Sequence, residues 1–313
     1  MKKAKENKKL NMDEKPVKKT SKKKSVILYS CIGVPIIALG IVGGVLLGQN
    51  VFKVDAYAGL DAEKINEDFS AVYTKYQRTS SDKYFKAFSD VEIANISLMN
   101  LNSEESFYTL STGNVIAAGV KQNINSTYIK YKGDYFEESI TESSFVKAAN
   151  RFYEDEEGVS WHKGKYAGAT NGDYSKATLT EYTIDDFEEI WGRPISRACV
   201  YIVTNQTRLE GSITDNNDGT HTISLDLDPT LSVLRYIKQM TMTGGLSQKP
   251  VFHTVNLKFT VDDNLKLLKF ETDECYDVHM VIDAKNSKGK LTQEFFYEER
   301  SIPKINEPSN YEK

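Results

Sequence analysis

A long uncharged stretch near the start of the chain constrains its fold most. No charged side chain occurs from residue 26 to residue 48. A helix of these residues spans roughly 34 Å at about 1.5 Å per residue, which exceeds the bilayer's hydrocarbon core of about 30 Å. A secretory signal has a shorter apolar core of about 7–15 residues. The stretch therefore predicts a permanent transmembrane helix, which we place at residues 26–50.

Two processing signals compete with this interpretation. Ala56-Tyr57-Ala58 has the pattern of a signal-peptidase site, but it lies well beyond the apolar run. Leu28-Tyr29-Ser30-Cys31 resembles a lipidation signal, yet most of the apolar residues follow the cysteine instead of preceding it. Cys31 is better explained as a small apolar residue of the helix.

The distribution of charge predicts the orientation of this helix. Residues 1–25 hold eleven lysines against three acidic residues, a formal charge of +8, whereas the whole chain carries −4 and the remainder therefore −12. Cytoplasmic flanks of membrane helices are rich in lysine, so we expect a single pass of the cell membrane, with a cytoplasmic N-terminus and an extracytoplasmic C-terminal domain. The basic tail is expected to be disordered and to lie against the lipid bilayer; it lacks the aromatic residues typical of nucleic-acid binding.

Three glycines lie on one face of the predicted membrane helix. Gly40, Gly44 and Gly48 recur every four residues. Small residues at this spacing let a second helix approach closely, which would support a homodimer. Glycine is also frequent in membrane helices in general, and that explanation stays open.

Residues 51–300 have the pattern of one strand-rich domain. Runs of Val, Ile, Thr, Tyr and Phe alternate with polar residues and predict antiparallel strands. Predicted helices begin after Asp61 and Ser89, and others cover residues 143–153, 183–194 and 228–245. Predicted turns fall at Gly113-Asn114, Lys132-Gly133, 215–220 and 285–289, and residues 197–213 are expected to pair as a strand with 221–228.

These patterns predict an α+β fold. We expect a large curved antiparallel sheet of about ten or more strands, with a few helices packed on one face, preceded by one transmembrane helix. Residues 301–313 are expected to form a flexible tail.

The sequence contains no motif for catalysis or for metal binding. It lacks H-E-x-x-H, G-x-S-x-G and a Walker loop, and its four histidines are far apart. The acidic run 154–157 is expected to be a solvated loop, and residues 215–220 a hairpin turn in place of a calcium loop. We therefore expect a protein that is not an enzyme and needs no cofactor or metal. Cys199 and Cys275 both lie in strand-like runs, and an extracytoplasmic location allows a disulfide between them.

The order of elements over residues 60–300 resembles that of the bacterial lipoprotein carriers, the LolA-like and LppX-like proteins. Helices come first, then hairpins, then the helix in "PTLSVLRYIKQMT", then a final meander; "YIKYKGDYFEESI" and "FYEDEEGVSWHKGK" have a similar strand-turn-strand rhythm. The resemblance implies a curved half-barrel whose concave face, covered by helices, holds lipid or acyl chains. Those carriers are soluble or lipid-anchored, whereas this chain keeps a membrane helix, which fits a fixed receiver or presenter of lipid better than a shuttle.

We therefore expect the domain to bind an apolar ligand, a lipid or lipoprotein, between the sheet and the helices. The alternative is an envelope scaffold or protein-interaction module with a solid core and no ligand. The expected lining residues are Val233, Leu234, Ile237 and Met240 on the predicted helix, facing Val255, Leu257 and Phe259.

Overall fold

A computed structural model describes residues 58–191, 193–196, 199–243, 246, 248–279 and 283–307. The predicted transmembrane helix, with Gly40, Gly44 and Gly48, and the basic tail lie outside these residues. Among the helices of the described part, none is both long and apolar enough to cross a membrane.

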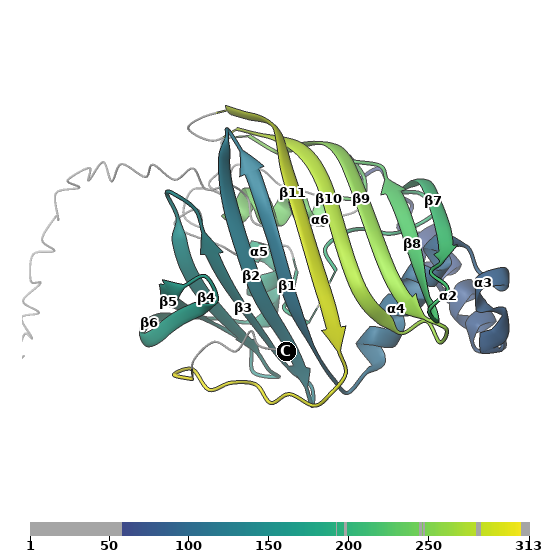
Figure 1. Cartoon of the computed structure of the whole chain (residues 1–313), viewed down its shortest axis with the longest axis horizontal. Helices are drawn as coiled ribbons and strands as arrows, with labels where there is room; N and C mark the ends of the chain where they lie inside the picture. Colours follow the sequence, from purple (N-terminus) through teal and green to yellow (C-terminus); the bar gives the residue numbers. More distant parts are fainter. Residues whose placement is uncertain are drawn as a thin grey trace, which may run out of the picture. The chain divides into compact units, whose positions relative to one another are not determined.

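One antiparallel sheet of eleven strands dominates the described part of the chain, in the order β6-β5-β4-β3-β2-β1-β11-β10-β9-β8-β7 (Figure 1). Two meanders, β1 to β6 and β7 to β11, are joined by the pairing of the first strand with the last. The strands are β1 (Ser106–Ala117), β2 (Val120–Tyr131), β3 (Asp134–Glu142), β4 (Lys147–Glu154), β5 (Val159–Gly168), β6 (Asn171–Tyr182), β7 (Arg208–Asp215), β8 (Thr220–Leu227), β9 (Val251–Asp262), β10 (Leu267–His279) and β11 (Asp283–Phe296).

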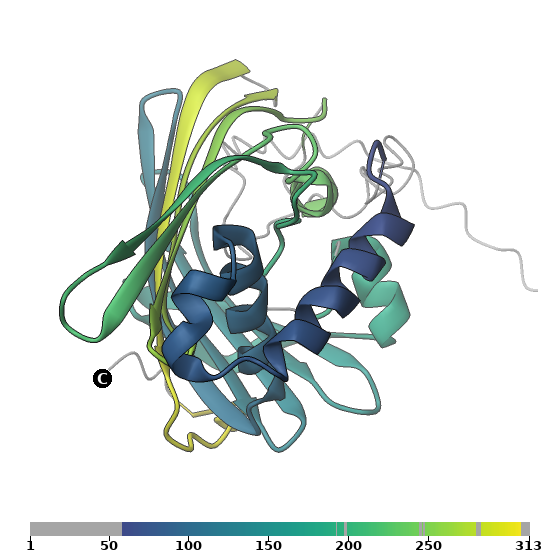
Figure 2. The same cartoon turned by 90° about the vertical axis from the view of Figure 1, so that its right-hand side faces the viewer.

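The helices lie on one side of this sheet, which we call its inner face; the opposite side is the outer face (Figure 2). The predicted α+β class and the large curved sheet are thus confirmed. The helices are α2 (Ala62–Tyr76), α3 (Tyr84–Ala87), α4 (Asp90–Ser103), α5 (Ile184–Trp191) and α6 (Leu234–Thr243), with a 3-10 turn at Ser81–Lys83.

Local capping and aromatic packing explain where two of these helices sit. The Ser89 hydroxyl accepts from the Glu92 backbone N–H while the Glu92 carboxylate accepts from the Ser89 N–H, which is the capping box that the sequence predicts for α4. On α5, Phe187 and Trp191 are buried and pack against Phe152 of β4, with ring centroids 5.7 and 5.2 Å apart. This packing holds the end of α5 against the inner face, where the next segment of the chain begins.

Two predicted elements are wrong because their residues pair as strands. Residues 143–153 were expected to be helical, but Lys147–Glu154 form β4 and pair with β3. Both faces of β4 are buried, so apolar residues do not alternate along it and their spacing imitates a helix. The predicted turn at 285–289 lies inside β11, and Ser287 is buried there.

Gly113 was predicted to lie in a turn, but it has a different role in the structure. Gly113 lies in the middle of β1, and a Cβ there would come within 2.6 Å of the Lys290 carbonyl oxygen on β11. The glycine therefore allows a close approach of strands. The hairpin turn falls instead at Ala118 and Gly119, both of which have positive φ.

Two further elements begin later than predicted. The strand expected from residue 197 begins only at Arg208, and Tyr201, Ile202 and Val203 are buried without being part of a strand. Helix α6 begins at Leu234, because the Asp228 carboxylate caps a separate turn by accepting from the N–H groups of Thr230 and Leu231.

The C-terminal segment differs from the expected flexible tail over residues 301–307. The Arg151 guanidinium on β4 donates to the carbonyl oxygens of Lys304 and Ile305, at 3.3 and 2.9 Å. Ile305 packs beside Tyr174 on the outer face. The segment is therefore docked onto the sheet.

Candidate functional site

The chain between α5 and β7 crosses the inner face of the sheet. We call its described residues 193–196 and 199–201 the roof segment. Three buried carboxylates rise from the sheet to hold it, one each on β3, β4 and β10: Glu137, Glu154 and Glu274.

Each carboxylate binds a different part of the roof segment. Glu137 accepts from the Arg193 guanidinium at 2.8 Å, and Glu154 accepts from the Ile195 N–H at 2.6 Å. Glu274 accepts from the Tyr201 hydroxyl at 2.5 Å. Hydrogen bonds to charged groups contribute about 1.5–3 kcal/mol and neutral ones about 0.5–1.5 kcal/mol, so the three bonds together hold the roof segment firmly against the sheet.

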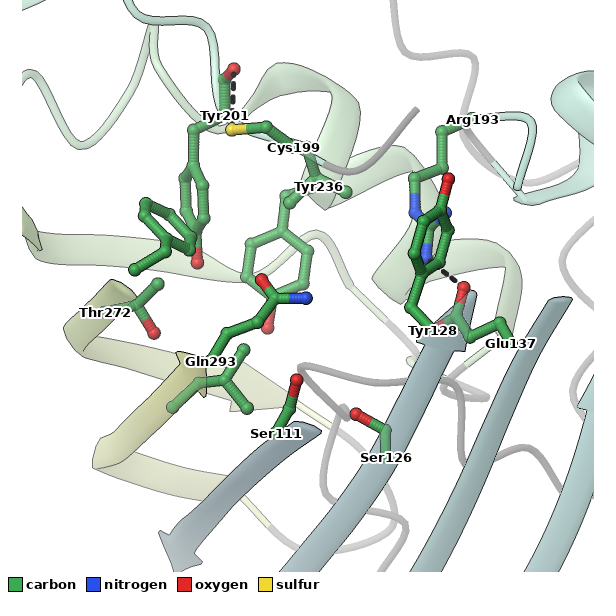
Figure 3. Close-up of a pocket in the computed structure, with 13 residues that line it drawn as sticks. Ser111, Ser126, Tyr128, Glu137, Arg193, Cys199, Tyr201, Tyr236, Thr272 and Gln293 are labelled. Carbon is green, nitrogen blue, oxygen red and sulfur yellow. Dashed lines mark hydrogen bonds and ion pairs between the residues drawn. The ribbon is translucent and has the colours of Figure 1, made fainter. Parts of the chain in front are cut away.

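A cavity of about 60 Å³ lies between the roof segment, α6 and the centre of the inner face. Figure 3 shows Tyr201 and Tyr236 descending into it from the roof segment and α6, with Ser111 and Ser126 on the opposite wall. The residues that line it come from five strands, the roof segment and α6: Ser111, Ser126, Tyr128, Glu137, Arg193, Cys199, Val200, Tyr201, Tyr236, Phe270, Thr272, Leu291 and Gln293.

Small polar side chains produce this hollow. Ser111, Ser126 and Gln293 occupy directly opposed positions on β1, β2 and β11, where larger apolar residues would fill the space. The site therefore depends on the pairing of β1 with β11, which brings together residues about 180 positions apart in the sequence.

Several of the hydroxyl groups around the cavity have no hydrogen-bond partner among the described residues. They include those of Tyr128 and Tyr236, whose side chains are buried. An unsatisfied buried polar group costs about 1–3 kcal/mol. A water molecule needs about 10–15 Å³ of such space, so the cavity has room for a few waters. A water molecule or a polar group of a ligand in the cavity would therefore supply the hydrogen-bond partners that these hydroxyls lack.

The ionisable groups around the cavity are shifted by burial. Burial raises the pKa of Glu274 to about 8, with the Tyr201 hydrogen bond opposing the shift. Burial alone would lower the pKa of Arg193, but the Glu137 carboxylate offsets it and raises that pKa. At neutral pH, Glu274 therefore favours its neutral form, and Arg193 and Glu137 form a compensated ion pair.

The seven residues expected to line a ligand site lie beside this cavity and not in its walls. Val255, Leu257 and Phe259 are fully buried in the main core, and Val233 and Met240 belong to the same core. Ile237 packs against that core, and Leu234 is half-buried at the start of α6. On α6 the cavity is lined by Tyr236, which the pattern did not single out.

Cys199 and Cys275 are both free thiols in the structure. Cys275 lies in β10, opposite Thr254 and Lys288 on neighbouring strands. Cys199 belongs to the roof segment and lines the cavity, and burial raises the pKa of its thiol to about 11. The disulfide that the sequence allowed is not formed.

One signal in the sequence could have pointed to the site. Glu154 and Glu274 stand at strand positions two residues away from the buried aromatic side chains of Phe152 and Tyr276, respectively. A charged residue at an inward position is costly and demands a partner. The acidic run was expected to be solvated, yet its first residue, Glu154, is buried and bound to the roof segment.

Comparisons with known proteins do not assign a family. No family model matches this chain, and no curated protein matches its sequence. Among solved structures, a DUF1329 family protein from Desulfovibrio piger is similar at 10% identity and a TM-score of 0.26, over 66% of this chain and 91% of that one. An N-terminal dehydratase from the difficidin assembly line is similar at 10% identity and a TM-score of 0.14, over 69% and 84%.

TM-scores this low do not indicate a shared overall fold, and we draw no conclusion about function from them. The fold class of this chain therefore follows from its own structure, which is a large open antiparallel sheet whose inner face is covered by helices and the roof segment.

Proposed function

We propose that this chain is a single-pass membrane protein whose extracytoplasmic domain binds a lipid or lipoprotein ligand between the sheet and the helices, without converting it chemically. The observation that carries the proposal is the cavity behind the roof segment, which combines unsatisfied hydroxyls with the apolar side chains of Val200, Phe270 and Leu291. A binding role is favoured over catalysis because the buried carboxylates of this region are engaged in holding the roof segment.

The size of the cavity sets a condition on this role. Ligand pockets commonly measure about 300–1,000 Å³, whereas this cavity measures about 60 Å³. A whole lipid therefore enters only if the roof segment or α6 moves away from the sheet. Under this proposal, the structure corresponds to a form without a bound lipid.

Replacing Ser111 by leucine tests the proposal by filling the cavity. We expect Ser111→Leu to reduce the lipid that co-purifies with the full-length chain by at least about tenfold, while the free energy of unfolding changes by less than about 1.5 kcal/mol because the new side chain enters existing space. Solvent extraction and lipid mass spectrometry provide the measurement.

The matched control is Ser212→Leu on β7, where the serine is exposed and lies outside the cavity. This variant should retain the lipid content of the wild-type chain. A wild-type chain that carries no lipid, or a Ser111→Leu chain that carries as much as the wild type, would contradict the proposal.

The rival function is an envelope scaffold or interaction module, and one observation favours it. The core between α6 and β9 is solidly packed, with Val233, Met240 and Val255 almost entirely buried. A scaffold predicts stable protein partners after cross-linking in cells and no difference between the two serine variants.

A further inference from the structure

Several groups that line the cavity are hydroxyls, which are uncharged and can both donate and accept hydrogen bonds. The hydroxyls of Ser111 and Ser126 face that of Tyr236 across the space (Figure 3). Tyr236 is 1% exposed, and its hydroxyl has no partner among the described residues. A ligand group that both donates and accepts, such as a hydroxyl, satisfies such walls better than a group that only accepts.

The walls offer no uncompensated charge to a ligand. The charged residues that line the cavity are Arg193 and Glu137, and they bind each other at 2.8 Å. Nearby Glu274 is bonded to Tyr201, and burial raises its pKa to about 8, which favours its neutral form at neutral pH. A phosphate or an ammonium group would lose its hydration here without gaining a counter-charge.

Aromatic and aliphatic surfaces complete the walls. The rings of Tyr201 and Tyr236 lie edge to face with centroids 5.7 Å apart, and Phe270 is beside them. Such surfaces can make apolar contacts with the C–H groups of a short carbon skeleton. With room for only a few waters, the cavity admits only the end of a larger molecule.

We infer that the cavity binds the uncharged, hydroxyl-bearing end of its ligand, a vicinal diol such as that of glycerol or of a sugar edge, in preference to a phosphate or ammonium group. This inference rests on the proposed function, because it assigns the polar end of the ligand that the domain holds. A free polyol and the head of a neutral lipid share this chemistry, and the test below separates them.

The test compares ligands that differ only at the polar end. Monooleoylglycerol and oleoyl-lysophosphatidate carry the same chain, and glycerol and methyl glucoside represent the free polyol. Each is titrated calorimetrically into the delipidated full-length chain, held in a polyoxyethylene detergent because a sugar-headed detergent would compete. We expect monooleoylglycerol to bind at least about tenfold more tightly than lysophosphatidate.

Tyr236→Phe removes one hydroxyl and keeps the ring, so it should weaken monooleoylglycerol binding by about three- to tenfold. Tyr73→Phe is the matched control, since Tyr73 is 47% exposed on α2; it should change nothing. Equal or tighter binding of lysophosphatidate would overturn the inference while leaving the proposed function intact. Glycerol binding as tightly as monooleoylglycerol would support the diol site but contradict the lipid ligand. Binding of none of the four would overturn both.

Discussion

Replacing Glu138 by glutamine is expected to lower the free energy of unfolding by about 3–5 kcal/mol. Glu138 and Arg151 form an ion pair on the outer face at 3.1 Å, and their side chains are 2% and 0% exposed. The Arg151 guanidinium also lies 4.0 Å from the centre of the Tyr174 ring. Without the carboxylate, a cation stays buried with no counter-charge, which is the costly arrangement. Urea unfolding of the full-length chain measures the change.

The double variant Glu138→Leu with Arg151→Met distinguishes a buried charge from general damage. It removes both charges together, so it should recover most of the stability that the single variant loses. It should also free the C-terminal segment, because Arg151 no longer binds the carbonyl oxygens of Lys304 and Ile305. Faster proteolysis near residue 305 would report that release. A double variant less stable than Glu138→Gln would contradict this explanation.

The second large effect is a dependence of stability on pH that originates at Glu274. Burial raises its pKa in the folded chain to about 8, above its ordinary value of 4.5. Below the ordinary pKa both states are protonated and the contribution to stability is fully present. As pH rises toward 8 the unfolded chain ionises first, so the folded state loses on the order of 4 kcal/mol across this interval.

Glu274→Gln isolates this effect, because the amide oxygen still accepts from Tyr201 but does not titrate. The difference in unfolding free energy between the wild type and this variant should decline from pH 4.5 to pH 8.5 and stay constant outside that interval. Glu210→Gln, at an exposed position of β7, is the control and should follow the wild type. Parallel curves for the wild type and Glu274→Gln would show that Glu274 ionises normally in the folded chain.

Much of the sheet could be predicted because local chemistry determines it. Lys132-Gly133 and residues 216–219 form turns as predicted, with positive φ at Lys132, Gly133, Asn217 and Gly219. On β9, Val255, Leu257 and Phe259 alternate with exposed residues and share the buried face. Patterns of period two and turn residues are sufficient for such segments.

The elements that were missed depend on tertiary contacts. β4 is buried on both faces, so its apolar residues show no period of two. The buried residues Tyr201, Ile202 and Val203 have the composition of a strand but pack as irregular chain beneath the helices. In both places the surroundings override local preference.

The candidate site could not be predicted from the sequence, because it too depends on tertiary contacts. Its polar residues are single serines, threonines and glutamines on separate strands, and each is unremarkable by itself. Only the register of β1 with β2 and β11 places Ser111 beside Ser126 and Gln293. The helix expected to line the ligand lies within the predicted residues but begins later, and it is Tyr236 that lines the cavity, while Val233 and Met240 belong to the core.

The accessibility of Cys199 tests most directly whether the space behind the roof segment is a ligand compartment. Cys199 lines the cavity, while Cys275 on β10 lies outside it and serves as an internal control. The full-length chain is treated with a thiol reagent before and after removal of bound lipid, and mass spectrometry measures the modification of each cysteine. We expect the removal of lipid to speed the modification of Cys199 and to leave that of Cys275 unchanged. Identical rates at Cys199 in the two preparations would contradict it.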